Sequence, residues 1–231
     1  MARKDKAKIL QLRNRSLISL TNPKSSIAEQ FRTVRTSIEF SSVDKDLRSV
    51  VITSPSPEEG KSTVTANLAV VFAQQGKRVL LVDSDLRKPT VHYTFHIENH
   101  VGLTNVLAKQ TTLEKAVKTT RQENLWILTS GPIPPNPSEL LGSSSMNALL
   151  EKAKNEYDLI IFDSSPVLAV TDAQVLSNLT DGVVLVISSG HTQKDSAKKA
   201  KELLESAKAK ILGVVLNNKK EQDSQHYYYG E

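Results

Sequence analysis

The residues that could most clearly take part in a chemical reaction lie between an apolar segment, 49–53, and a helical pattern that begins near residue 61. The connecting loop ends in Gly60-Lys61-Ser62, the end of a Walker A phosphate-binding motif in the strand–loop–helix context that this motif requires. Backbone N–H groups at a helix start, with the positive end of the helix dipole, are suited to holding phosphate oxygens. Lys61 can reach the β- and γ-phosphates of a nucleotide, and the Ser62 hydroxyl can hold Mg²⁺. We therefore assign a nucleotide site to Glu59, Gly60, Lys61, Ser62 and Thr63.

The loop departs from the full motif in two ways. The pattern G-x-x-x-x-G-K-S places glycine at position 55, where this chain has Pro55, and Pro57 is a second residue without an N–H group. Glu58 and Glu59 also put carboxylates beside a phosphate site, so we expect both side chains to point away from it. Because a Gly-Lys-Ser sequence also occurs by chance, the assignment needs independent support.

Three aspartates supply that support. Asp83 follows the apolar segment 79–82, Asp85 lies two residues further on, and Asp163 follows the apolar segment 159–162. An apolar strand that ends in aspartate is the Walker B arrangement, in which the carboxylate holds Mg²⁺ directly or through water. One or two carboxylates suffice for that ion, and the third can act as a general base on an incoming hydroxyl. Each aspartate alone could cap a helix, but the combination with the loop favours a Mg-nucleotide site.

Short apolar segments alternate with helical patterns along the chain. Strands that are apolar throughout and separated by helices indicate a parallel sheet covered on both faces, with ligands at the carboxyl ends of the strands. We therefore predict an α/β fold of the P-loop NTPase type, with a mostly parallel central sheet flanked by helices on both faces. The predicted strands are 49–53, 78–83, 125–129, 158–163, 182–188 and 211–216, and the predicted helices are 24–41, 61–75, 102–108, 113–118, 138–155, 172–178 and 193–208.

Length and composition limit the domain organisation. The 231 residues suit one α/β domain, and we divide the chain into a basic flexible arm at 1–21, a P-loop domain at 22–218 and a flexible tyrosine-rich tail at 219–231. The absence of cysteine excludes disulfides and thiolate metal sites. The arm could contact an anionic membrane surface or nucleic acid, although a solvated chain end is the more ordinary interpretation. The longest apolar runs fall far short of the roughly 18–20 residues that span a bilayer.

Two polar features lie outside the predicted nucleotide site. Glu29, Arg32 and Arg35 are spaced three apart on the predicted helix 24–41, and spacing alone indicates a solvated, salt-paired face. Tyr227-Tyr228-Tyr229 lie in a polar tail of a chain that has few aromatic residues. These tyrosines could pack back on the domain, but an exposed chain end favours a phosphorylation substrate.

Taken together, these residues resemble the BY-kinases, the bacterial tyrosine kinases of capsule and exopolysaccharide synthesis. The resemblance covers nearly the whole chain from about residue 22. The segment Asp83-Ser-Asp85-Leu-Arg-Lys-Pro89 is similar to the family's Walker A′ segment, and the tyrosine triplet to its autophosphorylation cluster. The segment Gly131-Pro-Ile-Pro-Pro-Asn-Pro-Ser-Glu-Leu-Leu141 is similar to another characteristic stretch, which by itself indicates a rigid loop entering a helix capped by Ser138. Glu29, Arg32 and Arg35 match the family's E-x-x-R-x-x-R oligomerisation motif.

The resemblance implies roles for the site residues. Lys61 and Ser62 would bind the phosphates and Mg²⁺ of ATP, Asp85 and Asp163 would hold the metal, and Asp83 would orient or deprotonate a tyrosine hydroxyl. The expected catalytic residues are therefore Asp83, Lys61 and Asp85, and the expected metal ligands are Ser62, Asp85 and Asp163. The family's loop has glycine where this chain has Glu58, which is a departure from its pattern.

The resemblance also implies an activity and partners. The chain would be an ATP-dependent protein-tyrosine kinase that phosphorylates its own tyrosine triplet in trans, and would regulate exopolysaccharide or capsule synthesis. It would assemble into a ring, and a membrane-anchored activator would recruit it from the cytoplasm to the inner face of the cell membrane. Other protein substrates and a cognate phosphatase would be further partners, whereas a nucleic-acid partner is not expected.

Two other functions fit the same motifs. A MinD/ParA-type ATPase switch shares the fold, but that class carries a signature lysine early in the loop, where this chain has Ser56. A non-catalytic nucleotide-binding adaptor is the second, and the intact aspartates argue against it. Asn217 and Asn218 could contact a nucleotide base or form a turn. His92, His96 and His100 are interpreted as ordinary loop residues.

Overall fold

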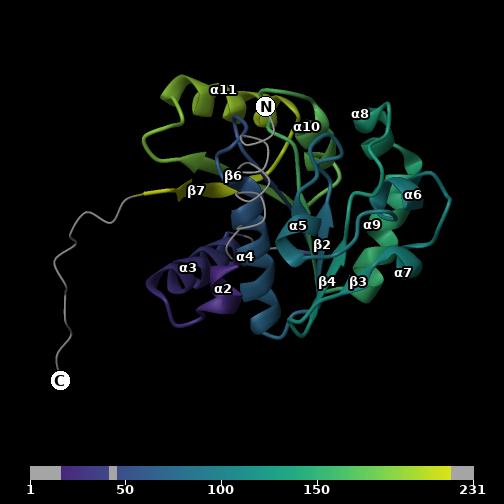
Figure 1. The fold of residues 1–231 in the computed structure, drawn as a ribbon. Helices are drawn as coiled ribbons and strands as arrows, with labels where there is room; N and C mark the ends of the chain where they lie inside the picture. The colour runs from purple at the N-terminus through teal and green to yellow at the C-terminus, as the bar shows by residue number, and fades with distance from the viewer. Residues whose placement is uncertain (1–16, 42–45, 220–231) are drawn as a thin grey trace, which may run out of the picture.

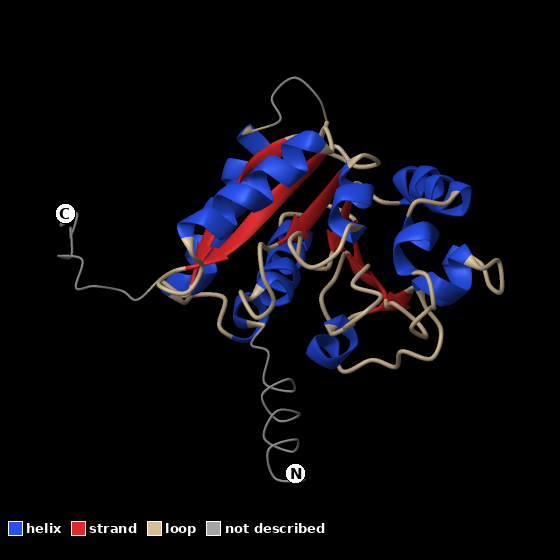
Figure 2. Ribbon diagram, turned by 90° about the horizontal axis from the view of Figure 1, so that it is seen from above, coloured by secondary structure: helices blue, strands red, loops and turns tan. Residues whose placement is uncertain are grey.

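The computed structural model describes residues 17–41 and 46–219 of the 231-residue chain. They form a seven-stranded sheet in the order β3-β4-β2-β5-β1-β6-β7, with helices on both sides of it (Figures 1 and 2). Neighbouring strands are parallel except β3, which pairs antiparallel with β4. The α/β fold class predicted from the sequence is therefore confirmed.

The elements have the following bounds. The strands are β1 (Ser49–Thr53), β2 (Val79–Asp83), β3 (Lys118–Thr119), β4 (Leu125–Leu128), β5 (Leu159–Asp163), β6 (Gly182–Ser188) and β7 (Ile211–Asn217). The helices are α2 (Ile18–Thr21), α3 (Ser26–Phe40), α4 (Lys61–Gln74), α5 (Val91–Phe95), α6 (Leu103–Leu107), α7 (Leu113–Ala116), α8 (Pro137–Leu141), α9 (Ser144–Glu156), α10 (Asp172–Ser177) and α11 (Lys194–Ser206).

The sheet has an apolar core on each face. Successive side chains of a strand point to opposite faces, so Val51 of β1 packs in one core and Ile52 in the other. Helices α2 to α5 cover the face of Ile52, and α6 to α11 cover the face of Val51. Because both faces are covered, the central strands are apolar at nearly every position, which is the pattern that predicted a parallel sheet.

Helix α4 is buried on almost all sides because α2 and α3 lie over it. Leu17 belongs to the same core, and the backbone N–H of Ser19 donates to Oδ1 of Asn67 in α4 at 2.9 Å. The carbonyl of Ser19 accepts from Nε2 of Gln74 at 3.0 Å. The structure therefore packs residues 17–21 onto the domain, although the sequence analysis placed them in the basic arm.

The strand order determines which loops meet. β5 lies between β1 and β2, and its last residue, Asp163, is in register with Ile52 of β1 and with Asp83 of β2. The end of β1 leads into the Gly60-Lys61-Ser62 loop. Since carboxyl ends of parallel strands lie at one edge of the sheet, the loop and the strand-end aspartates converge there.

Four elements differ from the predicted pattern. The predicted helix 138–155 is two helices, because α8 ends at Leu141 and α9 begins after Ser143, its N-cap. Helix α2, with four residues, strand β3, with two, and helix α5, with five, are too short to show a periodicity. None of these three was predicted from the sequence.

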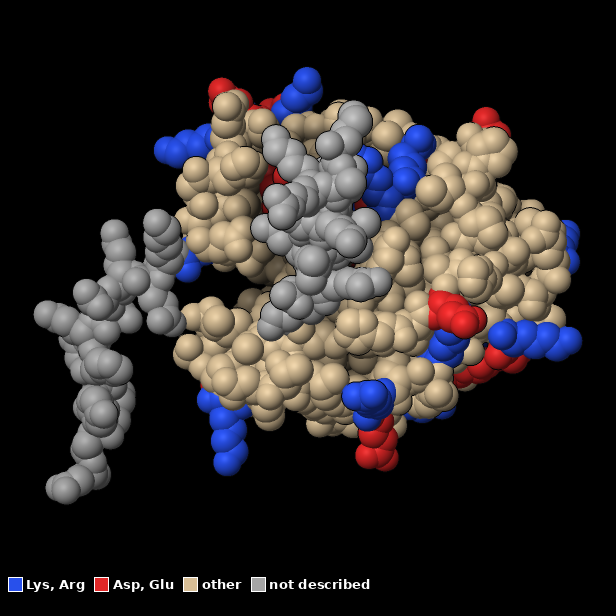
Figure 3. Space-filling view, viewed as in Figure 1, with Lys and Arg blue, Asp and Glu red and all other residues tan. Residues whose placement is uncertain are grey.

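The outer surface is mixed in charge on the face seen in Figure 3, where Lys and Arg side chains of the described residues are interspersed with Asp and Glu. Most ion pairs between these residues are partly exposed, such as Lys77 with Glu39 at 2.9 Å. Such pairs contribute little to stability. Within the described part of the chain, no helix is both long enough and apolar enough to cross a membrane.

The break between α8 and α9 yields a stability prediction. The Ser143 side chain accepts a hydrogen bond from Met146 N–H, so Ser143→Ala should lower the free energy of unfolding by about 1 kcal/mol in urea titrations. Ser144→Ala, one residue later and exposed, should change it by less than about 0.5 kcal/mol. Equal effects of the two substitutions would contradict the capping role.

Candidate active site

The phosphate loop runs from β1 to α4, and Gly60 is the N-cap residue of that helix. Its φ of 87° lies in the left-handed region, which glycine adopts without steric cost. A Cβ at this position would lie 2.1 Å from Nδ2 of Asn217, so a larger residue would also displace that side chain. The same Nδ2 donates to the carbonyl of Glu59 at 3.0 Å. Asn217, considered above as a base contact, thus holds the backbone of the loop in this structure.

Lys61, the first residue of α4, lies among the strand-end carboxylates. Its Nζ is 2.9 Å from Oδ2 of Asp85, 3.5 Å from Oδ1 of Asp163 and 3.2 Å from Oγ of Ser62. Lys61 and both aspartates are buried, and a buried charge is costly unless it is paired. The structure therefore brings together the predicted phosphate-binding lysine and the predicted metal ligands.

This cluster shifts the pKa values of its members. Burial by itself would lower the pKa of Lys61, but the charges of Asp163 and Asp85 outweigh it and raise that pKa. Burial would raise the pKa of Asp85, but the Lys61 ammonium and the hydrogen bonds it receives lower it instead. Lys61 and Asp85 are therefore an ion pair. For Asp83, burial and the nearby charge of Asp163 raise the pKa to about 8.

Asp83 is fully buried and organises the segment that follows β2. Its Oδ2 accepts hydrogen bonds from the backbone N–H groups of Thr90 and Val91, both at 2.9 Å, at the start of α5. Its Oδ1 has no hydrogen-bond partner among the described residues. Asp83 does not line the cleft described next, so its role toward an incoming hydroxyl stays a prediction.

A cleft of about 760 Å³ opens above Lys61. Predicted site residues that line it are Gly60, Lys61, Ser62, Thr63 and Asp85. The side chain of Glu59 points away, as expected, because its carboxylate is buried and accepts from Oγ1 of Thr192 at 2.8 Å. Burial raises the pKa of Glu59. The side chain of Glu58 was also expected to point away from the phosphate site, but Glu58 is exposed and contributes to the lining of the cleft.

The donor atoms in the cleft suit Mg²⁺. The Ser62 hydroxyl and the Asp85 carboxylate both line it, and hard oxygen ligands are those that this ion prefers. Asp163 is fully buried beside Lys61, and its Oδ1 also accepts from Oγ1 of Thr65 at 3.3 Å. The described residues contain no group of three or more His, Asp or Glu side chains that could hold a metal ion. Mg²⁺ needs none, because it retains waters and shares phosphate oxygens.

The predicted oligomerisation residues have partners within the chain. Arg32 forms an ion pair with Glu29 and also donates to the carbonyl of Pro23 at 2.7 Å. Nη1 of Arg35 donates to the carbonyl of Val71 in α4 at 2.9 Å. None of the three lines the cleft, and their role between subunits stays a prediction. The tyrosines at 227–229 lie outside the described residues.

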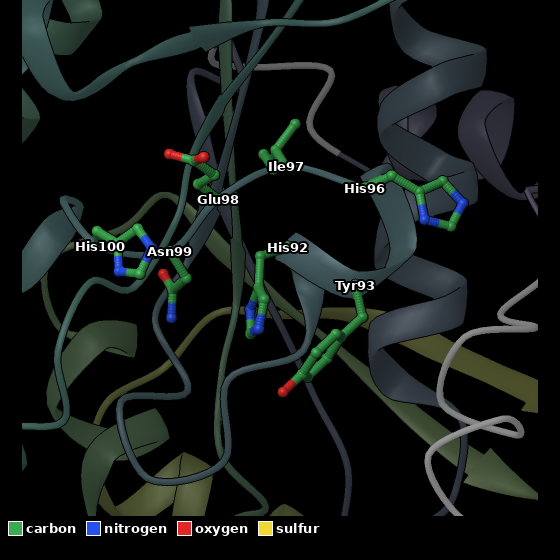
Figure 4. Close-up of a pocket in the computed structure, with 7 residues that line it drawn as sticks. All are labelled: His92, Tyr93, His96, Ile97, Glu98, Asn99 and His100. Atoms are coloured by element: carbon green, nitrogen blue, oxygen red, sulfur yellow. The ribbon is translucent and has the colours of Figure 1, made fainter. Parts of the chain in front are cut away.

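A second pocket, of about 400 Å³, lies beside α5 (Figure 4). His92, His96 and His100 line it, and Figure 4 shows their imidazoles spread along the segment rather than converging on one point. His92 lies in α5 and not in a loop, with its ring centroid 3.9 Å from that of Tyr93. Tyr93 also lines the main cleft, so the two pockets are neighbours.

Sequence reasoning missed several polar residues next to the site. Asp172 at the start of α10 resembles an ordinary first-turn acid, and Ser165 is one of two serines after Asp163. Ser138 is not the cap of its helix as expected, because Asn136 is the N-cap residue. The Ser138 hydroxyl instead donates to Oδ1 of Asp172 at 2.6 Å. Only the strand order, which places these segments side by side, could have revealed this contact.

The fold and this site define a P-loop nucleotide-binding protein, with a phosphate loop after β1 and aspartates after β2 and β5. Comparison with known proteins agrees with this assignment. The family model described as "AAA domain" matches residues 58–211. The chain is 58% identical over 217 residues to Tyrosine-protein kinase YwqD of Bacillus subtilis, covering 94% of this chain and 92% of that protein.

Solved structures show the same relationship. The kinase domain of Escherichia coli tyrosine kinase ETK matches with a TM-score of 0.86 at 35% identity, covering 94% of this chain and 85% of that one. MinD complexed with Mg-ADP from Pyrococcus horikoshii matches with a TM-score of 0.63 at 28% identity, covering 73% of this chain and 69% of that one. The chain belongs to the bacterial tyrosine-protein kinase family, and MinD is a more distant relative of the same fold.

Glu58 yields a prediction about the loop. Its φ of 66° is left-handed, which costs an ordinary residue about 1 kcal/mol, and its carboxylate lies where phosphates would approach. Glu58→Gly should therefore tighten Mg-ATP binding several-fold without lowering the free energy of unfolding. Isothermal titration calorimetry and urea unfolding measure the two effects.

Glu58→Gln is the matched control, because it removes the charge and keeps the backbone strain. It should tighten binding while leaving stability within about 0.5 kcal/mol of the wild type. Weaker nucleotide binding in both variants would show that the Glu58 carboxylate helps rather than opposes the bound phosphates.

Proposed function

We propose that this chain transfers the γ-phosphoryl group of Mg-ATP to tyrosine hydroxyls, among them those of its own Tyr227, Tyr228 and Tyr229. The observation that supports this most is the position of Lys61, in contact with Asp85 and beside Asp163 and Ser62 at the base of the cleft. One cation, two carboxylates and a hydroxyl are the groups that a phosphoryl-transfer site needs.

Each residue then has a role. The N–H groups of the loop and the Lys61 ammonium would bind the phosphates, and Ser62, Asp85 and Asp163 would hold Mg²⁺, directly or through water. When bound, Mg²⁺ would supply neutralisation of the phosphate charge. Asp83, in its ionised form, would orient the tyrosine hydroxyl and receive its proton. Catalysis of this kind depends on positioning and charge stabilisation rather than on covalent chemistry by the protein.

The reaction balances with these groups. The tyrosine oxygen forms a bond to the γ-phosphorus, and the bond from that phosphorus to the oxygen bridging to the β-phosphate breaks. The hydroxyl proton passes to the carboxylate of Asp83, and ADP leaves with the electron pair of the broken bond. The products are phosphotyrosine and ADP, and no oxidant or further reactant is required.

We propose that the tail is phosphorylated in trans. The tail follows β7, whose last residue, Asn217, contacts the phosphate loop through Glu59. A chain of ten residues spans at most about 36 Å, so the tail could reach only nearby sites. Head-to-tail association of subunits through Glu29, Arg32 and Arg35 would place a neighbouring cleft within that reach, and such contacts can close into a ring.

The wider role is proposed on the family resemblance. A membrane-anchored activator would recruit the chain from the cytoplasm to the inner face of the cell membrane and stimulate it. Other protein substrates and a cognate phosphatase would complete the cycle, which would regulate exopolysaccharide or capsule synthesis. The divisions of the chain at 1–21, 22–218 and 219–231 are part of this proposal, with the qualification that residues 17–21 pack on the domain.

A MinD-type ATPase switch is the second candidate, supported by the TM-score of 0.63 to MinD complexed with Mg-ADP. The higher score of 0.86 to a tyrosine kinase domain favours the kinase. Ser56, at the position of the signature lysine of the MinD class, favours it as well. A non-catalytic adaptor has no specific observation in its favour. Lys61, Asp85 and Asp163 are all present, and both carboxylates lie within 3.5 Å of the Lys61 ammonium.

A mixing experiment tests transfer in trans. One variant carries Tyr227→Phe, Tyr228→Phe and Tyr229→Phe with an intact site, and the other carries Ser62→Ala with an intact tail. Neither should form phosphotyrosine in its tail alone with Mg-ATP. Their mixture should phosphorylate the tail of the Ser62→Ala chain, as shown by peptide mass spectrometry.

The wild type, with and without phosphatase pretreatment, is the reference for the extent of phosphorylation. Phosphotyrosine in the wild type but not in the mixture would contradict the transfer in trans and leave transfer within one chain. ATP hydrolysis by the wild type without phosphotyrosine, even with an activator's cytoplasmic segment present, would instead support the MinD-type switch.

A further inference from the structure

Four side chains, those of Arg87, Asp172, Ser165 and Asp85, lie in series, each within hydrogen-bond distance of the next. Arg87 contacts Asp172 through two nitrogens, with Nε 2.9 Å from Oδ2 and Nη2 3.1 Å from Oδ1. Oγ of Ser165 lies 3.2 Å from Oδ2 of Asp172. The same Oγ lies 2.9 Å from Oδ1 of Asp85. These contacts therefore connect the segment after β2, helix α10 and the loop after β5.

Burial makes these contacts obligatory. Asp172 is fully buried and Ser165 is 1% exposed, whereas the side chain of Arg87 is 39% exposed and lines the cleft. A buried carboxylate without partners is strongly unfavourable. The planar guanidinium of Arg87 satisfies both oxygens of Asp172 at once, which is the strong, directional form of such a pair. The hydrogen bond to Asp172 also raises the pKa of Arg87.

The number of available protons determines which carboxylate receives a hydrogen bond from Ser165. A serine hydroxyl has one proton, and both of its carboxylate neighbours are acceptors, so it donates to one of them. Asp172 already receives two N–H groups from Arg87 and the hydroxyl of Ser138 at 2.6 Å. The proton of Ser165 is thus available to Oδ1 of Asp85, which also accepts from the N–H of Lys88 at 3.0 Å.

We propose that Ser165 is a positioning residue that fixes the orientation of Asp85 for Mg²⁺. Arg87 assists by satisfying Asp172, which leaves the Ser165 proton to Asp85. This inference rests on the proposed role of Asp85 as a metal ligand. Two oxygens of one carboxylate then have different tasks: Oδ1 is held by Ser165 and Lys88, and Oδ2 faces Lys61. Partners that orient a ligating group typically account for about 10- to 100-fold in metal affinity or activity.

The test is the Mg²⁺ dependence of ADP binding, which requires no turnover. In the full chain, Ser165→Ala should raise the Mg²⁺ concentration for half-maximal ADP binding about tenfold, measured by calorimetry. Ser164→Ala is the matched control, because its hydroxyl is also buried but contacts only the carbonyl of Ser165, at 3.5 Å. The control should match the wild type within about twofold, and the two variants should have similar urea unfolding midpoints.

A double-variant cycle tests the part of Arg87. Arg87→Gln removes the guanidinium that satisfies Asp172, so the Ser165 proton should turn to Asp172 and Mg²⁺ binding should weaken. Ser165→Ala added to Arg87→Gln should then cost less than about twofold more, because both remove the same hydrogen bond to Asp85. If Arg87→Gln fails to fold, the comparison of Ser165→Ala with Ser164→Ala still decides.

The proposal would be contradicted if Ser165→Ala required a Mg²⁺ concentration within about twofold of the wild type. It would also be contradicted if the effects of the two variants in the double-variant cycle simply multiplied, or if ADP binding by the wild type did not depend on Mg²⁺. A wild-type chain that binds Mg-ADP as expected but forms no phosphotyrosine would contradict the proposed function. The comparison of the serine variants would still test the positioning role in that case.

Discussion

The structure depends on one buried ammonium group. Lys61 lies 2.9 Å from Asp85 and 3.5 Å from Asp163, and the charges of these two carboxylates raise its pKa. Without that cation, Asp85 and Asp163 would lose the ammonium that pairs with them, and removing one partner of a buried ion pair costs several kcal/mol. In the proposed function the same ammonium also binds the phosphates. Stability and phosphate binding would then both depend on one atom, Nζ of Lys61.

The sheet produces this arrangement by strand order. β5 lies between β1 and β2, so Asp163 is in register with Asp83, and the loop after β1 faces both of them. Within the cluster, Asp83 and Asp85 differ in environment although they are two residues apart. Asp83 holds the start of α5 and has a raised pKa, whereas Asp85 faces the cleft and has a lowered one. Two carboxylates from one strand end can thus take different roles.

Local sequence predicted most of the elements and the residues that converge at the carboxyl edge of the sheet, because both follow from short-range patterns. The apolar segments and the Gly-Lys-Ser loop are visible within a few residues, and all six predicted strands are present. The Ser138–Asp172–Ser165 contacts could not be predicted, since they join residues up to 34 positions apart through the tertiary fold. Glu58 is a further case, because nothing local in the sequence shows a left-handed backbone at a non-glycine residue. The tail and the arm were assigned from composition alone and lie largely outside the described residues.

The most direct test of this account is the urea unfolding of Lys61→Met, with and without Mg-ATP. We predict that the free energy of unfolding falls by about 3 kcal/mol relative to the wild type, with no protection by the nucleotide, because the buried carboxylates and the phosphates lose the same cation. Lys77→Met, which removes a partly exposed lysine paired with Glu39, should cost less than about 1 kcal/mol and keep the protection. A Lys61→Met chain as stable as the wild type, or one that Mg-ATP stabilises equally, would contradict the central role of Lys61.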